Sequence, residues 1–188
     1  MAPRRSSTLP PLLAVSAATC TALASPPAAG QEQLLHLGVQ AGYATATLPE
    51  LLVGGFGGGG VITYGVSDAF NLRLHGDVSI HKLPEANSLL LGGVAAGAEY
   101  LLDVLDWVPY AGLMIGPSHG SFQATGGQWL LGVEVPFGLG YRLLPEVTLM
   151  GEGRVKWLFL GDETAPTNQL WLSVRFEYVW QLSDGGRT

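Results

Sequence analysis

Hydrophobic and polar residues alternate with a period of two along most of the chain. In residues 170–182, every even position from 170 to 180 is apolar, whereas the odd positions include Arg175 and Glu177. Successive side chains of a β-strand point to opposite faces, so this period predicts a strand with one apolar face. An α-helix would place Arg175 and Val179 on the same face and gives no such division.

The same period predicts an all-β chain of eight antiparallel strands. The expected strands cover 35–45, 59–66, 70–81, 89–102, 107–116, 129–143, 147–159 and 170–182. Short connections at 67–69, 103–106 and 144–146 alternate with longer ones at 46–58, 82–88, 117–127 and 160–168. Strands of about 9 to 11 residues joined by turns that alternate in length in this way are typical of up-and-down transmembrane β-barrels.

The placement of the charged residues distinguishes a membrane barrel from a soluble sheet. The apolar faces of the eight segments carry no Asp, Glu, Lys or Arg. A lysine or arginine that faces lipid at the bilayer midplane costs about 2 to 4 kcal/mol, so this absence is expected for a surface in contact with lipid.

The opposite faces carry both signs of charge. A barrel of eight strands is only wide enough for its own side chains to fill the interior, and an isolated buried ion is costly. We therefore expect the inward charges to pair with one another and plug the lumen. This structural lumen network is predicted to contain Arg73, His75, Asp77, Glu99, Glu134, Arg142, Glu152, Arg154, Lys156, Arg175 and Glu177.

Outward aromatic residues gather near both ends of the expected strands. They are Tyr64, Phe70, Tyr100, Trp107, Tyr141, Tyr178 and Trp180 at one end, and Tyr43, Trp129, Trp157 and Phe159 at the other. Two such girdles at the membrane interfaces are characteristic of membrane barrels, whereas a soluble sandwich would bury aromatic residues near the middle of its strands.

Residues 1–30 have the features of a secretory signal peptide, and 31–188 would form the barrel domain. Arg4 and Arg5 precede a short apolar core, and cleavage is expected after Ala24 or after Gly30. Two alternatives are a lipoprotein signal that ends at Cys20 and an Ala/Pro-rich tail on a cytosolic protein. If the leader is removed, the mature chain has no cysteine, because Cys20 is the only one.

Three short patterns suggest chemistry and also have simpler explanations. The glycine-rich run 54–60 lacks the lysine and the βαβ context of a phosphate-binding loop, and an outer loop that leads into a strand is the expectation. His75, Asp77, Ser79 and His81 share one strand face and could form a metal site or a hydrolase triad, but they point inward, which favours packing in the lumen. Ser118, His119 and Ser121 are expected in a solvated loop.

Three stretches resemble the outer-membrane-protein β-barrel domain, the small porin-like family. They are GGGGVITYGVSD at 57–68, WVPYAG at 107–112 and GLGYR at 138–142, and the resemblance extends over about residues 34–182. It implies the barrel fold more than any activity. Many members end on an aromatic residue that the assembly machinery reads, whereas Trp180 is followed here by eight further residues.

The expected function is that of a barrel in the bacterial outer membrane with a structural or surface-interaction role, and not of an enzyme. Alternatives are an enzyme that modifies lipid A and a narrow channel for small solutes. The expected partners are outer-membrane lipids and, during biogenesis, the barrel-assembly machinery. A net charge of −6 argues against nucleic acid as a partner, and no cofactor, metal or specific ligand is indicated.

Overall fold

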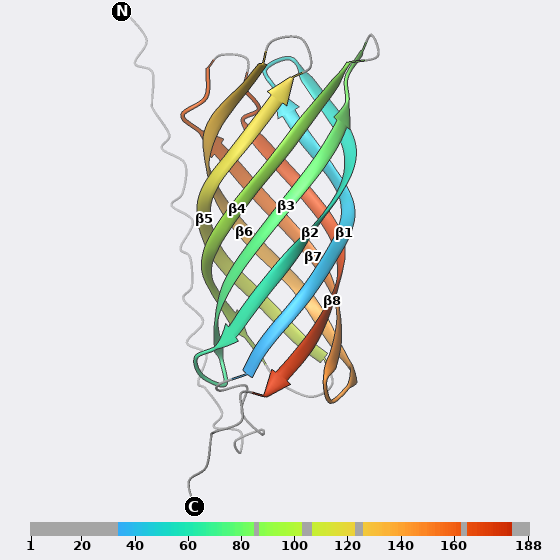
Figure 1. The fold of residues 1–188 in the computed structure, drawn as a ribbon, viewed down its shortest axis with the longest axis vertical. Coiled ribbons are helices and arrows are strands. Elements are labelled where there is room, and N and C mark those ends of the chain that lie inside the picture. The colour runs from blue at the N-terminus through green and yellow to red at the C-terminus, as the bar shows by residue number, and fades with distance from the viewer. Residues whose placement is uncertain (1–33, 85–86, 103–106, 123–125, 163–164, 182–188) are drawn as a thin grey trace, which may run out of the picture.

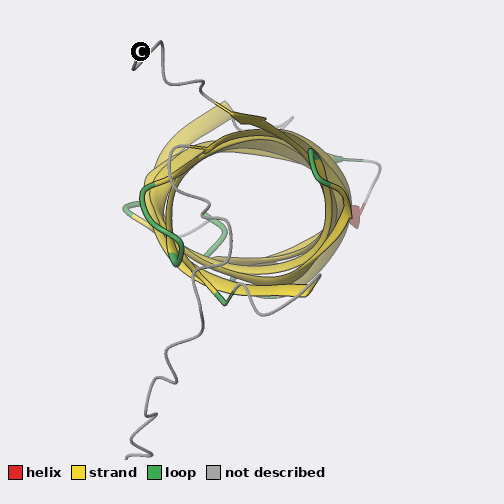
Figure 2. Ribbon diagram, turned by 90° about the horizontal axis from the view of Figure 1, so that it is seen from below, coloured by secondary structure: helices red, strands yellow, loops and turns green. Residues whose placement is uncertain are grey.

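Eight antiparallel strands form a closed barrel in the computed structural model (Figures 1 and 2), which describes residues 34–84, 87–102, 107–122, 126–162 and 165–181. The strands are β1 (Leu34–Leu48), β2 (Leu51–Gly65), β3 (Phe70–Lys82), β4 (Ser88–Leu101), β5 (Trp107–Phe122), β6 (Gly126–Leu144), β7 (Val147–Phe159) and β8 (Asn168–Gln181). The prediction of an eight-stranded, all-β, up-and-down barrel is confirmed. Within the described residues, no helix has the length and apolar character needed to cross a membrane.

Each strand pairs with its neighbours in sequence, and β1 closes the barrel by pairing with β8. The register of this seam runs from Leu34 opposite Gln181 to Thr47 opposite Asn168. Closure leaves no sheet edge with unpaired backbone groups, which a strand in lipid could not tolerate. Because the number of strands is even, β1 starts and β8 finishes at the same end of the barrel, at the bottom of Figure 1. We call it the terminal end and the opposite end the loop end.

The outward face of the wall is apolar along the described strands. Large exposed hydrophobic side chains occupy every strand, and Val39, Phe56 and Leu113 each expose more than half of their surface. The charged side chain among the outward strand positions is Lys82, at the loop-end tip of β3. A water-soluble protein would not leave so continuous an apolar surface uncovered, and a bilayer covers it.

The expected outward aromatic residues are exposed near both ends. At the terminal end, Phe70 packs edge-to-face against Tyr100 with ring centroids 5.1 Å apart, and Trp107 packs in a tilted arrangement against Tyr141 at 4.7 Å. At the loop end, Tyr43 meets the ring of Phe56 at 5.3 Å. These cross-strand pairs lie at the levels where aromatic girdles meet a membrane interface.

The predictions of long loops at 46–58 and 117–127 are wrong. Residues 46–58 form the ends of β1 and β2 around a two-residue turn at Pro49–Glu50, and most of 117–127 belongs to β5 and β6. The glycine run 54–60 is therefore part of β2, paired with both β1 and β3, and not a loop. Glycines carry no side chain whose polarity could alternate, so the strand period disappears from the sequence where the strand continues.

The proposed leader at 1–30, with its two cleavage sites and Cys20, lies outside the described residues and stays a prediction. Most of the residues that follow Trp180 also lie outside them.

The prolines within strands have a local effect. Pro136 faces Gly112 where the pairing of β5 with β6 is interrupted between Ala111 and Met114, as expected for a residue without an N–H donor.

Candidate functional site: the polar lumen

The lumen is lined by the polar members of the alternating pattern, and most of them are fully buried. Charged side chains come from β3, β4, β6, β7 and β8, whereas β1 and β2 contribute neutral residues and glycines. Long charged side chains from one side of the lumen therefore reach toward the smaller residues of the other. They form two groups at different heights along the barrel.

The first group, nearer the terminal end, contains Arg73, Glu99, Glu152, Arg175 and Glu177, and we call it the terminal-side ion group. Arg73 Nη1 lies 2.6 Å from both Glu99 Oε1 and Glu152 Oε2. Arg175 reaches Glu152 at 2.8 Å through Nη1 and Glu177 at 3.0 Å through Nε. Glu152 is the centre of the group, since it also accepts a hydrogen bond from the Tyr110 hydroxyl at 2.8 Å.

The second group, nearer the loop end, contains Asp77, Glu134, Arg154 and Lys156, and we call it the loop-side ion group. Arg154 Nη2 lies 2.7 Å from Asp77 Oδ2, and Lys156 Nζ lies 2.8 Å from Glu134 Oε1. His75 lies among them, with Nε2 3.1 Å from Glu134 Oε2 and in contact with the Arg154 guanidinium. Two acids and two bases balance within this group.

Aromatic rings hold the long cations in place. The Arg154 guanidinium lies over the Trp171 ring and that of Arg175 over the Tyr110 ring, each 5.1 Å from the ring centroid. Trp171 is 1 % exposed, and its ring fills the space in front of Gly57. A β-carbon at residue 57 would overlap the Trp171 ring and the neighbouring backbone, so glycine is required there.

Apolar side chains close the lumen at the loop end. Ala46, Leu48, Val53, Leu89 and Leu91 form one buried cluster, with Leu83 packed against it. Leu130, Leu158 and Ala165 form a second cluster. Between these clusters and the ion groups lies a polar layer in which Gln169 Nε2 donates to Ser79 Oγ at 2.9 Å. A third cluster, of Leu101, Val108, Tyr110 and Met150, lies toward the terminal end, so the lumen is polar in its middle and has apolar clusters toward both ends.

Comparisons with known proteins give matches in structure alone. No protein-family model and no curated protein sequence matches the chain. Among solved structures, Neisserial surface protein A (NspA) is 20% identical, with a TM-score of 0.65, over 77% of this chain and 96% of that one. The attachment invasion locus protein Ail of Yersinia pestis, in complex with the heparin analogue sucrose octasulfate, is 10% identical, with a TM-score of 0.59, over 79% and 99% of the two chains.

The N-terminal β-barrel domain of OprF from Pseudomonas aeruginosa is 12% identical to this chain. The match has a TM-score of 0.52 and covers 79% of this chain and 98% of that domain. The chain has the fold of the small outer-membrane β-barrels. Together with its apolar outer wall, this fold places the protein in the bacterial outer membrane.

The candidate nucleophile of this outer-membrane barrel is sealed inside the wall. Ser79 Oγ lies 2.9 Å from His81 Nε2, which is a hydrogen-bonded serine–histidine pair. However, Ser79 is 1 % exposed and His81 is 0 % exposed. Gln169, an amide and not a carboxylate, is the third member of the layer. A lipid substrate outside the wall does not reach this pair.

One set of side chains has the spacing of a metal site. Ligand atoms of His75, Asp77 and Glu134 lie within 4.8 Å of one another. Arg154 and Lys156 contact the same two carboxylates, so their positive charges already occupy the place of a cation. The arrangement favours a salt-bridge network over a metal centre.

The third short pattern does not form one site. Ser118, His119 and Ser121 belong to β5 and not to a loop, so the expectation of a solvated loop is wrong. Ser118 faces the lumen, where Lys156 Nζ lies 3.3 Å from its hydroxyl. His119 lies on the outer face against the Trp129 ring. Strand parity therefore separates these residues.

Ten of the eleven residues that the sequence assigned to the lumen are buried there: the nine members of the two ion groups and His75, which lies beside the second group. Arg142 is the exception, because it is exposed at the terminal-end mouth. Sequence reasoning missed the roles of Tyr110, Trp171 and His36, although parity already placed Trp171 on the inward face. The sequence does not show the register of the strands. The register determines which side chains meet across the lumen, and therefore which aromatic ring packs against each guanidinium.

Proposed function

We propose that this protein is an outer-membrane barrel whose lumen is plugged by ion pairs and which has a structural or surface-interaction role. The observation that supports the proposal most is the filling of the lumen. Two ion groups of long side chains cross it, and apolar clusters close its loop end. A diffusion pore uses a wider barrel that leaves an aqueous channel.

We further propose that the terminal end faces the periplasm and the loop end the outside of the cell. The longest connection between strands, 160–167, is at the loop end, as is common for extracellular loops. The lipids of the outer membrane would then contact the apolar wall, and the barrel-assembly machinery would act on the chain during biogenesis. The apolar outer wall supports the first of these two proposed partners.

The loop end does not favour a polyanionic partner such as the heparin analogue bound to Ail. Among the described residues at this end, Lys82 is basic, whereas Glu50 and Asp162 are acidic. Recognition of sulfate groups relies on clustered basic side chains, particularly arginine. The described surface therefore supports a structural role better than binding of polyanions.

Conductance of the refolded protein in a planar bilayer tests the plug. We expect the closed lumen to give no sustained single-channel current, and stable channels would contradict the plug. Mass spectra of lipid A from strains with and without the protein test the enzymatic alternative. An acyl-chain difference between the two strains would overturn the non-enzymatic proposal.

A deletion strain separates the structural role from the surface-interaction role. If the protein is structural, its loss should raise sensitivity to detergent, and a variant with residues 84–87 replaced by a Gly/Ser linker should restore resistance. If resistance returns with the wild-type protein but not with the linker variant, the loop end carries the function.

A further inference from the structure

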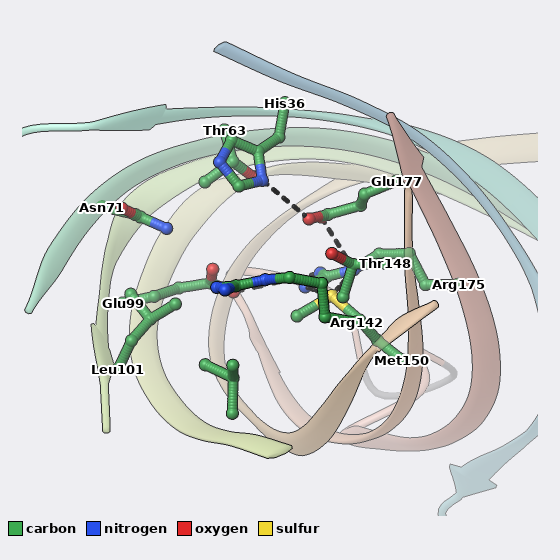
Figure 3. Close-up of a pocket in the computed structure, with 11 residues that line it drawn as sticks. His36, Thr63, Asn71, Glu99, Leu101, Arg142, Thr148, Met150, Arg175 and Glu177 are labelled. Carbon is green, nitrogen blue, oxygen red and sulfur yellow. Dashed lines mark hydrogen bonds and ion pairs between the residues drawn. The ribbon is translucent and has the colours of Figure 1, made fainter. Parts of the chain in front are cut away.

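A small pocket lies at the terminal end of the lumen. Side chains from all eight strands line it, including His36 of β1, Thr63 of β2 and Glu99 of β4 (Figure 3). Arg142, exposed at the mouth, extends across the opening, while buried Arg175 forms part of the inner wall. The volume of about 20 Å³ accommodates a water molecule and no organic solute.

Polar atoms at this pocket have no partner within the described residues. They are His36 Nε2, Thr63 Oγ1 and Asn71 Oδ1. The three residues are 6 %, 2 % and 2 % exposed, so bulk solvent does not cover these atoms. Buried polar atoms in proteins are almost always hydrogen bonded, either to protein or to an ordered water molecule.

The orientation of His36 directs one nitrogen to the protein and leaves the other for a ligand. His36 Nδ1 lies 3.3 Å from Glu177 Oε2 across the seam between β1 and β8. The opposite nitrogen, Nε2, lies on the side of Thr63, the residue directly paired with His36 on β2. A single small molecule could therefore hydrogen-bond both side chains.

The charges around the pocket favour a neutral ligand. Glu99 and Glu177 are balanced by Arg142 and Arg175 among the residues that line it. A bound cation or anion would leave an uncompensated charge in a confined, partly buried space, which is costly. Water fits both the size and the hydrogen-bonding groups, because it can donate and accept.

We propose that this pocket is a water-binding site, in which one ordered water molecule hydrogen-bonds His36 Nε2 and Thr63 Oγ1. Water enters the lumen from the terminal end and stops at the terminal-side ion group. The loop end contributes no water, because the apolar clusters close it. The proposal goes beyond the plug, since a filled lumen could equally be dry from end to end.

Three of the four histidines of the chain provide the test, because His36, His75 and His81 lie at three heights in the lumen. Exchange of the C2 hydrogen of each imidazole in D₂O is measured by mass spectrometry on the barrel refolded in lipid vesicles. The urea-unfolded chain provides the reference rate for each histidine. We expect His36 to exchange about tenfold or more faster than His75 and His81. If His36 is as slow as the other two, the pocket is dry. If all three are fast, water is not confined to the terminal end. Either result overturns the proposal.

A matched pair of variants tests the ligand assignment. Thr63→Val preserves volume and removes the hydroxyl, so we expect the exchange of His36 to slow by about tenfold, toward the rate of His75. Thr148→Val is the control, because Thr148 lines the same pocket but is not among the atoms without a partner, and we expect no change. Equal effects of the two substitutions, or no effect of Thr63→Val, would contradict the site. Unheated gel mobility verifies that both variants are folded.

Discussion

The two faces of the same eight strands differ more than the two sides of most soluble sheets. On β8, Val174 leaves 52 % of its surface exposed toward the outside, while the next residue, Arg175, is 0 % exposed and binds two carboxylates in the lumen. The polarity is thus inverted relative to a soluble barrel, with apolar residues outside and charges within. The difference shows that the medium around the wall, and not the geometry of the strands, determines whether the outward residues are polar or apolar.

The largest expected effect comes from removing the centre of the terminal-side ion group. Glu152→Ala leaves the guanidinium groups of Arg73 and Arg175 without their shared carboxylate. Breaking a buried ion pair by removing one partner costs about 3 to 5 kcal/mol, so the free energy of unfolding should fall by that amount. Urea unfolding of the barrel refolded in vesicles measures it.

The control for this substitution is Glu146→Ala, in the exposed turn at the terminal end. We expect a change there within about 0.5 kcal/mol, as for most surface substitutions. Similar losses at 146 and 152 would mean that the lumen carboxylate is not part of a buried network.

A charge placed on the outer wall should have the next largest effect. Val174→Arg puts a guanidinium near the middle of β8, facing lipid, and should destabilise the barrel by about 2 to 4 kcal/mol. Thr47→Arg, near the loop-end tip of β1, should cost only about 0 to 1 kcal/mol because the interface is close. Equal costs at the two depths would argue against a bilayer around the wall.

A side chain added to an inward glycine should cost less than either change of charge. Gly57→Val collides with the Trp171 ring and should destabilise the barrel by about 1 to 3 kcal/mol through overpacking. Gly60→Val is the matched control on the outer face of the same strand, where the nearest atom to a new β-carbon is the Gly38 oxygen at 3.8 Å. We expect no loss there, and a larger loss at 60 than at 57 would reverse the assignment of faces.

The smallest expected effect is at the aromatic girdle. Phe70 and Tyr100 form a cross-strand pair on the outer wall, and Phe70→Leu should cost about 0.5 to 1 kcal/mol. A double-mutant cycle with Tyr100→Leu isolates the contribution of the pair. A coupling energy of zero would show that the two rings contribute separately.

Much of the wall could be predicted from the sequence, because the polarity of each side chain indicates whether it faces the lumen or the lipid. The strands containing Arg175 and Asp77 show the period over their full length. The start of β2 could not be predicted, since the glycines of 54–60 have no polarity to alternate. A strand can therefore be predicted from the sequence only where polar and apolar side chains alternate.

The pairing within the lumen could not be predicted. Arg73 contacts Glu99 on the adjacent strand and Glu152 on a distant one, and the second contact depends on the relative register of strands that do not touch. Strand parity gives the face of each residue but not its height in the barrel. For the same reason, the pocket beside His36 and the place of Trp171 in front of Gly57 became visible only in the structure.

The most direct test of the membrane barrel is the environment of successive positions along β8. Single cysteines at 172, 173 and 174, in a chain without Cys20, are spin-labelled and exposed to oxygen and to a water-soluble nickel relaxant. We expect positions 172 and 174 to be accessible to oxygen but not to nickel, and 173, which faces the lumen, to be shielded from both. High nickel accessibility at 172 and 174 would show that the apolar face is in water and would contradict the account.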